Sequence, residues 1–360
     1  MKIALLGGGQ LARMLALAAH PLGLRVSILD PAPDACAAPI AEHHLASFDN
    51  QAALRALLKD ATAVSFEFEH IPPETLEFLS QFSQVLPHPR AVQVAQDRLR
   101  EKLLFRKLDI PMPRFVTINQ RRDLELAVSE LGLPLVLKTR THGYDGKGQR
   151  LARTTEDIES AWQELGAQSL LAEEHVPFEY ELSAIAVRGR DGTCRYYPLT
   201  VNEHHEGILR VSLPRFGDEL QWLAESYTHR ILENLDYIGV LVCEFFVYEG
   251  RLLANEIAPR VHNSGHWTIE GAETSQFENH LRAILGLPLG ETTPVGYSAM
   301  VNFIGTLPPT ERVLAIPGAH LHAYGKQDRP GRKVGHATLC CTSLDQLNTH
   351  LPELLRLSAS

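Results

Sequence analysis

The first hundred residues alternate short apolar runs with amphipathic stretches, which is the pattern of a parallel α/β unit. Three runs have the length of a strand, and the first is followed by a glycine turn and then by apolar side chains at the helical period. The predicted strands are residues 2–6, 25–30 and 63–66, and the predicted helix is residues 11–20, ended by Pro21. We therefore predict a Rossmann-like domain over residues 1–97.

Pro111 and Pro113 end the next predicted helix and indicate the passage into a second domain. A helix over residues 98–108 is predicted to face inward through four leucines, Leu99, Leu103, Leu104 and Leu108. Further helices are predicted at 121–131, 155–165, 218–235 and 276–285, and strands at 133–139, 169–174, 181–188 and 299–304. The end of the chain is predicted to form short strands and turns.

A hairpin is predicted where two apolar runs flank the loop 249–251, with a glycine at its centre. An odd loop of this length places Glu244 directly opposite Glu256, whereas an even loop would put the two acids on opposite faces. Two facing carboxylates repel each other unless a cation lies between them. Together with the amide of Asn255 they predict a Mg²⁺ site, to which Mn²⁺ is also suited. The alternative is a pair of solvated acids on an exposed hairpin.

Composition narrows the class of protein. The chain has 360 residues, of which 44% are hydrophobic and 21% charged, as in soluble enzymes of two or three domains. A net charge of −9 argues against non-specific nucleic-acid binding, and no apolar run approaches the roughly 20 residues of a membrane span. The five cysteines lack CxxC spacing, and the apolar start is too short for a signal peptide. We expect small-molecule substrates and a cytoplasmic location.

A second glycine-rich segment follows the strand that carries Lys138. Glycines at 143, 146 and 148 allow a hairpin loop to close over phosphates, and Lys138 and Lys147 supply positive charge. The spacing is not that of a Walker A motif. A lysine on the strand that precedes a glycine loop is instead typical of kinase-like nucleotide sites. A plain flexible surface loop is the alternative.

The first glycine turn also permits more than one interpretation. Gly7, Gly9 and Ala12, with Asp30 about 20 residues on, satisfy the dinucleotide fingerprint. A glycine turn at a helix start binds any phosphate, however, because its amides and the helix dipole attract anions. An NAD-dependent oxidoreductase and a non-catalytic nucleotide-binding protein are therefore the competing classes.

Four further polar groups lie at predicted strand ends or bends. Glu69 and His70 follow the third strand, and Glu173 precedes a hinge at His175–Pro177 that is suited to a purine base. The run 260–268 is typical of an anion site. Cationic side chains gather in 329–336 around a Pro-Gly turn. The adjacent pair His204–His205 lacks the partners of a zinc motif.

Taken together, these blocks resemble the ATP-grasp enzymes, in which ATP lies between two α+β subdomains and an acyl phosphate is attacked by an amine. The blocks that carry the resemblance are Gly8–Leu11, Gly143–Gln149, Asn255–Thr268 and Arg329–His336. Within that superfamily they are similar to the 5-(carboxyamino)imidazole ribonucleotide synthases, although Leu11–Arg13 stands where relatives commonly have a glycine. The resemblance implies a pre-ATP-grasp domain over 1–97, a lid over 98–174, and an ATP-grasp domain over 175–360 that carries the metal and ribonucleotide sites and a small β-rich end.

The resemblance also implies roles for individual residues. ATP falls to Arg98, Lys138, Gly143, Tyr144, Asp145, Gly146, Lys147, Gly148, Gln149, Glu173, Glu174, His175, Val176, Glu181, His204, Asn255 and Glu256, and Mg²⁺ to Glu244 and Glu256. The ribonucleotide falls to Gly9, Gln10, Glu69, Arg260, His262, Asn263, Ser264, Lys326, Arg332 and Lys333. Catalytic roles fall to Asp145, Lys326, Arg332 and His262, with Asp145 orienting the amine or taking its proton.

The implied reaction is the carboxylation of the exocyclic amine of 5-aminoimidazole ribonucleotide with ATP and bicarbonate, through carboxyphosphate, in purine biosynthesis. Carboxyphosphate hydrolyses in water, so closure of the glycine loop would protect it. A homodimer is implied by the same resemblance. The alternative is another ATP-grasp carboxylate-amine ligase or carboxylase, such as biotin carboxylase or the formate-dependent glycinamide ribonucleotide transformylase.

Overall fold

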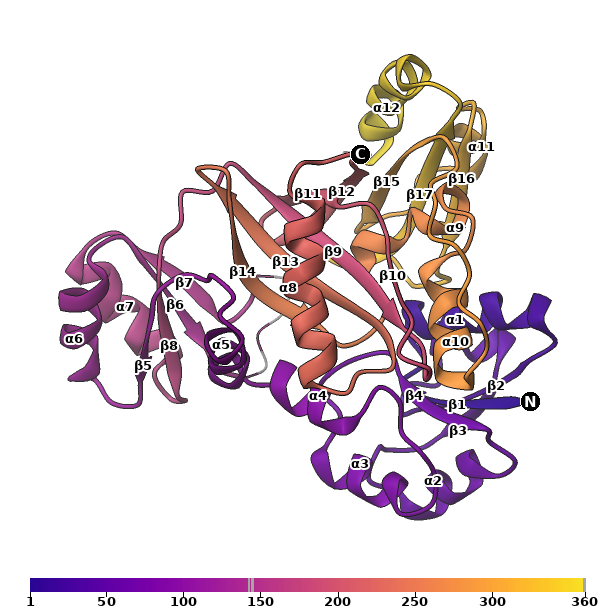
Figure 1. Ribbon diagram of the computed structural model, residues 1–360, viewed down its shortest axis with the longest axis horizontal. Helices are drawn as coiled ribbons and strands as arrows, with labels where there is room; N and C mark the ends of the chain where they lie inside the picture. Colours follow the sequence, from indigo (N-terminus) through magenta and orange to yellow (C-terminus); the bar gives the residue numbers. More distant parts are fainter. Residues whose placement is uncertain (142, 144–145, 359–360) are drawn as a thin grey trace.

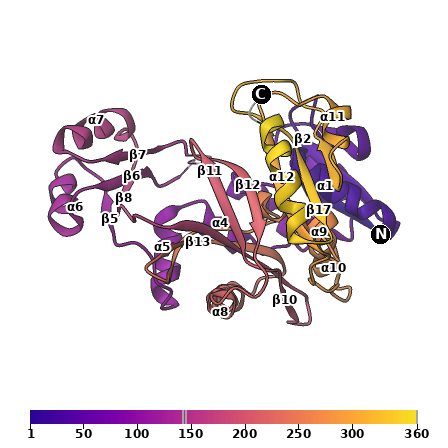
Figure 2. The same cartoon turned by 90° about the horizontal axis from the view of Figure 1, so that it is seen from above.

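Three β-sheets organise the computed structural model, which describes residues 1–141, 143 and 146–358 (Figure 1). An N-terminal parallel sheet, a small antiparallel lid sheet and a long antiparallel main sheet follow one another along the chain. The lid sheet lies at one end of the molecule and the N-terminal and C-terminal parts lie at the other (Figures 1 and 2). No helix among the described residues has both the length and the apolar character that a membrane span requires.

The N-terminal sheet has the strand order β3-β2-β1-β4, all parallel, as the alternating pattern predicted. The strands are β1 (Lys2–Leu6), β2 (Arg25–Asp30), β3 (Glu42–Leu45) and β4 (Ala63–Phe66). The helices are α1 (Gln10–Ala19), α2 (Gln51–Leu58), α3 (Pro73–Ser80) and α4 (Pro89–Ala95), with short 3₁₀ turns η1 (His20–Leu22) and η2 (Ala38–Ile40). The strand order reverses between β1 and β4, which is the position where open α/β sheets bind ligands.

The lid sheet has the order β5-β8-β6-β7 and a hydrophobic core of its own. Its elements are β5 (Phe115–Ile118), α6 (Asp123–Leu131), β6 (Leu135–Thr139), β7 (Gln149–Ala152), α7 (Thr155–Leu165) and β8 (Leu170–Glu174). Strands β6 and β7 form the hairpin predicted for the glycine loop, with Lys138 paired to Gln149.

Helix α5 (Arg98–Lys107) connects the N-terminal domain to the lid, and its predicted inward face was partly wrong. Leu103 is 46% exposed, whereas Glu101 and Lys102 are buried at 2% and 0% exposure. The helix packs against an edge strand whose polar backbone groups need partners, so charged side chains occupy its inner face.

The main sheet has the order β14-β13-β9-β11-β12-β15-β17-β16, with β10 paired to β9. Its strands are β9 (Tyr180–Arg188), β10 (Cys194–Tyr196), β11 (Thr200–His205), β12 (Ile208–Pro214), β13 (Gly239–Tyr248), β14 (Arg251–Ala258), β15 (Tyr297–Ile304), β16 (Ala319–Ala323) and β17 (Lys333–Cys341). The helical elements are α8 (Gln221–Asn234), η3 (Asn263–Gly265), α9 (Thr268–Gly271), α10 (Gln276–Leu285), α11 (Thr310–Leu314) and α12 (Leu344–Ser358). The expectation of only short strands and turns at the end of the chain was wrong, because α12 and the nine residues of β17 lie there.

The predicted facing of Glu244 and Glu256 is confirmed, but the reason given for it was wrong. The loop between β13 and β14 has two residues, Glu249 and Gly250, both with positive φ, so Tyr248 pairs with Arg251. That even loop alone would place Glu244 opposite Asn255. A β-bulge inserts Asn255 as the extra residue and shifts the register, so that Glu244 pairs with Glu256.

The N-terminal domain and the main sheet share one hydrophobic core. Helices α1 and α10 pack together, and His280 of α10 bridges the two sheets by bonding Ser65 on β4 and the backbone N–H of Val240 on β13, each at 3.1 Å. These two parts therefore form one frame, beside which the lid is a separate unit.

Candidate functional site

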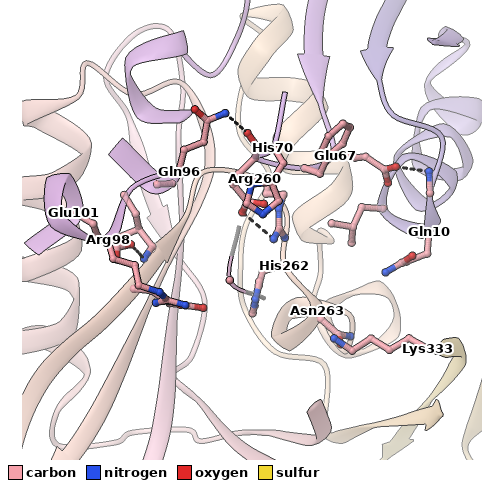
Figure 3. A pocket seen from close by; sticks show the side chains of 18 of the residues that line it. Gln10, Glu67, His70, Gln96, Arg98, Glu101, Arg260, His262, Asn263 and Lys333 are labelled. Atoms are coloured by element: carbon pink, nitrogen blue, oxygen red, sulfur yellow. Dashed lines mark hydrogen bonds and ion pairs between the residues drawn. The ribbon is translucent and has the colours of Figure 1, made fainter. Parts of the chain in front are cut away.

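A cavity of about 450 Å³ opens where the N-terminal domain, helix α5, the glycine loop and the main sheet meet (Figure 3). Its wall contains ten of the residues predicted for ATP or the ribonucleotide: Gly9, Gln10, Glu69, Arg98, Gly143, Glu256, Arg260, His262, Asn263 and Lys333. The start of α1 and the segment after β14, far apart in sequence, thus face the same space.

A smaller cavity of about 170 Å³ lies against the first. The two share Arg98, Glu256, His262, Asn263 and Lys333, and the second adds Lys138, Gly146, Gln149, Glu181, His204, Glu244 and Asn255. Residues predicted for ATP, metal and ribonucleotide therefore surround two connected spaces.

Of the two facing acids, Glu256 lines both cavities and Glu244 lines the smaller one. Glu256 pairs with Arg98 at 3.1 Å, while the Glu244 Oε1 lies 3.6 Å from His262 Nε2 and 3.5 Å from the Ser183 hydroxyl. Burial and the neighbouring carboxylate of Glu256 raise the pKa of Glu244 to about 8. Such a rise is what uncompensated facing carboxylates produce.

The donor set at these acids fits a hard divalent cation. The buried Oδ1 atom of Asn255 has no hydrogen-bond partner among the described residues. Two carboxylates and an amide oxygen are ligands that Mg²⁺ prefers. Within the described ranges, no cluster of three or more His, Cys, Asp or Glu side chains could hold an ion. An ion at Glu244 and Glu256 would therefore need oxygen atoms from a phosphorylated substrate as well.

Beneath the smaller cavity, Glu173 is buried between two ammonium groups. Its carboxylate lies 2.8 Å from Lys138 Nζ and 3.4 Å from Lys102 Nζ. Burial alone would raise the pKa of Glu173, but the two lysines outweigh it and lower that pKa to about 2. Glu173 therefore fixes the position of Lys138 rather than facing either cavity.

The start of α1 already holds an anion from its own domain. The carboxylate of Glu67 accepts hydrogen bonds from the backbone N–H groups of Gly9 and Ala12, the latter at 2.9 Å, and Asp30 accepts from Gly8 at 2.8 Å. A Cβ atom on Gly9 would lie 2.6 Å from Glu67 Oε1, so a side chain there would displace this carboxylate. The dinucleotide fingerprint is thus satisfied internally, which disfavours the NAD interpretation.

Neighbouring residues hold the polar side chains of the larger cavity in place. Arg260 Nη2 pairs with Glu69 at 2.8 Å, and Gln96 donates to the carbonyl of Glu69 at 2.6 Å. His262 Nδ1 lies 2.9 Å from the Ser264 hydroxyl, and burial and Arg260 lower the pKa of His262 well below its usual value. His262 is therefore a neutral imidazole at physiological pH.

In the smaller cavity, His204 contacts the carboxylate of Glu181. Burial alone would lower the pKa of His204, but Glu181 outweighs it and raises that pKa. The pair lines the cavity together with Glu244, so the raised pKa favours the protonated form of His204 at this wall.

The basic residues near the C-terminus are only partly brought together. Lys333 lines both cavities, and Lys326 Nζ bonds Gln10 Oε1 at 2.5 Å at the edge of the larger one. Arg332 Nη1 lies 3.4 Å from the Gln327 carbonyl, so its own loop contributes to its placement.

Other predicted residues do not line either of the two cavities found among the described residues. The carboxylate of Glu174 pairs with Arg114 at 2.7 Å, and Lys147 is exposed. His175, Val176, Gly148 and Ser264 complete this group. Tyr144 and Asp145 lie outside the described residues, so their roles stay predictions.

Sequence reasoning missed four residues of this region: Glu67, Glu101, Lys102 and Phe246. Phe246 lies two residues beyond Glu244 on β13, hence on the same face, and its ring stacks on Phe178 with centroids 4.7 Å apart. The spacing of two residues from a predicted metal ligand was a signal for Phe246. The three charged residues gave no comparable local signal.

Comparisons with known proteins cover the whole chain. A family model described as an ATP-grasp domain matches residues 103–277, a ribonucleotide synthetase preATP-grasp domain matches residues 1–96, and a phosphoribosylaminoimidazole carboxylase C-terminal domain matches residues 298–350. The N5-carboxyaminoimidazole ribonucleotide synthase of Pseudomonas aeruginosa is 54% identical over 98% of both chains, and that of Aquifex aeolicus is 39% identical over 96% of this chain and 94% of its own.

Solved structures agree with these relatives. The N5-carboxyaminoimidazole ribonucleotide synthetase of Thermus thermophilus superposes with a TM-score of 0.95 and 51% identity, over 100% of this chain and 99% of that one. The Aspergillus clavatus synthase in complex with ADP and 5-aminoimidazole ribonucleotide superposes with a TM-score of 0.92 and 32% identity, over 99% and 98%.

Proposed function

This chain belongs to the N5-carboxyaminoimidazole ribonucleotide synthases, and from that membership we propose which of its residues handle each substrate. It is an ATP-dependent ligase of purine biosynthesis that carboxylates the exocyclic amine of 5-aminoimidazole ribonucleotide. The reaction requires that bicarbonate be activated by ATP and then delivered to the amine before water intervenes.

The triphosphate of ATP occupies the smaller cavity in this proposal. Lys138 and Arg98 face its triphosphate, because both line that cavity and Glu173 fixes Lys138 from behind. The purine base lies at the hinge 174–177, beside the exposed ring of Phe178 and the half-buried ring of Phe246. The glycine loop covers the phosphates from the lid side.

Glu244 and Glu256 would hold Mg²⁺, with the Oδ1 atom of Asn255 as a further candidate ligand. Mn²⁺ suits the same oxygen ligands. When bound there, the cation supplies charge compensation at the phosphoryl oxygens during transfer.

Bicarbonate and the ribonucleotide occupy the larger cavity. Arg260 and Lys333 attract the bicarbonate and phosphate anions, and Gln10 with Lys326 lies where the ribonucleotide phosphate enters. His262, neutral and on the shared wall, can accept a proton from bicarbonate as its oxygen attacks the γ-phosphorus of ATP. Carboxyphosphate, or CO₂ released from it, then meets the amine, with Asp145, Lys326 and Arg332 in their predicted roles.

The observation that supports this division most directly is the shared wall of the two cavities. It lets a group activated in the smaller space react in the larger one without crossing bulk water.

Release of ADP tests the assignment. With ATP, Mg²⁺, bicarbonate and aminoimidazole ribonucleotide present, ADP should form, and omission of any one should abolish it. His262→Asn should lower kcat by about 10²–10⁴-fold, as loss of a general base does, with ADP affinity unchanged. His320→Asn, at an exposed position on β16 that lines neither cavity, is the matched control. Full ADP release without bicarbonate or ribonucleotide would contradict the proposal.

We also propose a cytoplasmic homodimer, by analogy with the family. Light scattering coupled to size-exclusion chromatography measures the mass directly, and a 40 kDa species would contradict the dimer.

A further inference from the structure

Strand β14, which carries Glu256, is the outer strand of the main sheet on its lid side. Its outward backbone groups have no neighbouring strand to pair with in the described sheet. Unpaired groups of this kind need other partners when they are buried.

Helix α5 supplies those partners on both sides of Glu256. The Oε1 atom of Glu101 accepts the backbone N–H of Ile257 at 2.6 Å, and Lys102 Nζ donates to the backbone carbonyl of Asn255 at 3.0 Å. The two side chains are 2% and 0% exposed, so water does not compete for these bonds.

Their position coincides with the bulge that sets the register of the two acids. Asn255 is the extra residue of that bulge, and its ladder position is otherwise irregular. Lys102 bonds the residue before Glu256 and Glu101 bonds the residue after it, so the backbone of Glu256 is restrained from both directions.

We propose that Glu101 and Lys102 are positioning residues for the metal site: they hold the backbone on either side of Glu256 so that its carboxylate faces Glu244. The inference rests on the proposed function in assigning the cation to Glu244 and Glu256. Neither Glu101 nor Lys102 ligates the cation; both act through residues 255–257.

The test measures Mn²⁺ binding to the ADP complex by the electron paramagnetic resonance signal of free Mn²⁺, which does not depend on turnover. Glu101→Met and Lys102→Met should each weaken Mn²⁺ binding by about 10–100-fold, the usual effect of losing a partner that orients a ligand. ADP affinity without metal should not change in Glu101→Met, whereas Lys102→Met also removes one of the two partners of Glu173, so its Mn²⁺ binding is measured at saturating ADP. Glu101→Gln keeps an oxygen that accepts from Ile257 and should bind Mn²⁺ like the wild type.

Lys107→Met is the matched control, since Lys107 lies on the same helix and is exposed. Amide exchange of the peptide over 253–258 provides a second readout, and it should accelerate in Glu101→Met but not in Glu101→Gln. Wild-type Mn²⁺ affinity in both methionine variants would overturn the inference. So would a loss in Glu101→Gln equal to that in Glu101→Met.

Glu256→Gln distinguishes a failure of the positioning role from a failure of the metal site. If it weakens Mn²⁺ binding while Glu101→Met and Lys102→Met do not, the positioning role is wrong and the metal site stands. If Glu256→Gln leaves Mn²⁺ binding unchanged, the metal assignment and the positioning role both fail.

Discussion

At the scale of single residues, buried Glu173 pairs with Lys138 and so fixes a lysine of the proposed nucleotide site. One carboxylate satisfies two ammonium groups that would otherwise repel each other in the protein interior. Removing one member of such a group is costly because it leaves an uncompensated buried charge.

Glu173→Gln should therefore lower the free energy of unfolding by about 3–5 kcal/mol near neutral pH. The pKa of Glu173 is depressed to about 2 from an ordinary 4.5, so its contribution is present above about pH 4.5 and is lost as the pH falls through 2. The stability difference between wild type and variant should shrink across that window. Urea unfolding at a series of pH values measures it.

Glu164→Gln is the control, because Glu164 forms an exposed pair with Arg150 on the lid surface. It should change stability little at any pH. A difference for Glu173→Gln that stays constant from pH 5 to about pH 2 would contradict the assigned shift.

The sequence identified most residues that line the two cavities but missed the ones that support them. Glu244, Glu256, Arg260 and His262 lie just where strand and loop patterns placed them. Glu101 and Lys102 could not be found in this way, because charged residues on a helix ordinarily face solvent and their partners lie more than 150 positions away.

At the scale of elements, α5 is anchored to the lid through its first turn. Asp97 caps the helix by accepting from Leu99 at 2.9 Å, and the same carboxylate binds Arg140 Nε at 3.0 Å. Arg140 directly follows β6. The contact therefore fixes the position of Arg98 on α5 relative to Lys138 on β6.

Asp97→Ala should destabilise the protein by about 1–2 kcal/mol through the lost cap and should also raise the KM for ATP. Thr154→Ala removes the cap of α7, also in the lid but distant from Arg98, and should cost similar stability with no change in that KM. Steady-state kinetics with thermal unfolding distinguishes the two. Equal KM values for both variants would contradict the anchoring role.

The hairpin shows why element boundaries are harder to predict than element types. Its two strands follow from their apolar runs, yet the loop has one residue fewer than predicted and a bulge restores the register. A bulge depends on contacts outside the strand, here those of α5, and strand periodicity does not contain that information. Helix α12 was not predicted, and it contains Pro352, a residue type that argues against a helix interior.

At the scale of the whole molecule, the N-terminal domain is fused to the main sheet through a common core. The alternation of apolar runs predicted each sheet separately but not their contact, because that contact joins residues more than 200 positions apart. His280 is the polar group at that junction, and burial lowers its pKa to about 4, so it is neutral at physiological pH.

His280→Leu should lower the free energy of unfolding by about 1–3 kcal/mol, because the Val240 N–H and the Ser65 hydroxyl lose their partner. Amide exchange of β1 and the fluorescence of the buried Trp267, measured with Trp162 and Trp222 replaced by Phe, should shift together in urea, since both domains share the core. His20→Leu, at an exposed position, is the control. Separate transitions for the two signals would contradict a common core.

The carboxylate of Glu67 at the start of α1 has a consequence for selectivity in the cell. Pyridine dinucleotides are abundant, and their diphosphate seeks the amides that Gly9 and Ala12 already direct at Glu67. A dinucleotide would have to displace a covalently attached competitor and bring its own negative charge beside that acid. The helix start that would otherwise attract a dinucleotide diphosphate is therefore already bonded to a carboxylate of the protein itself.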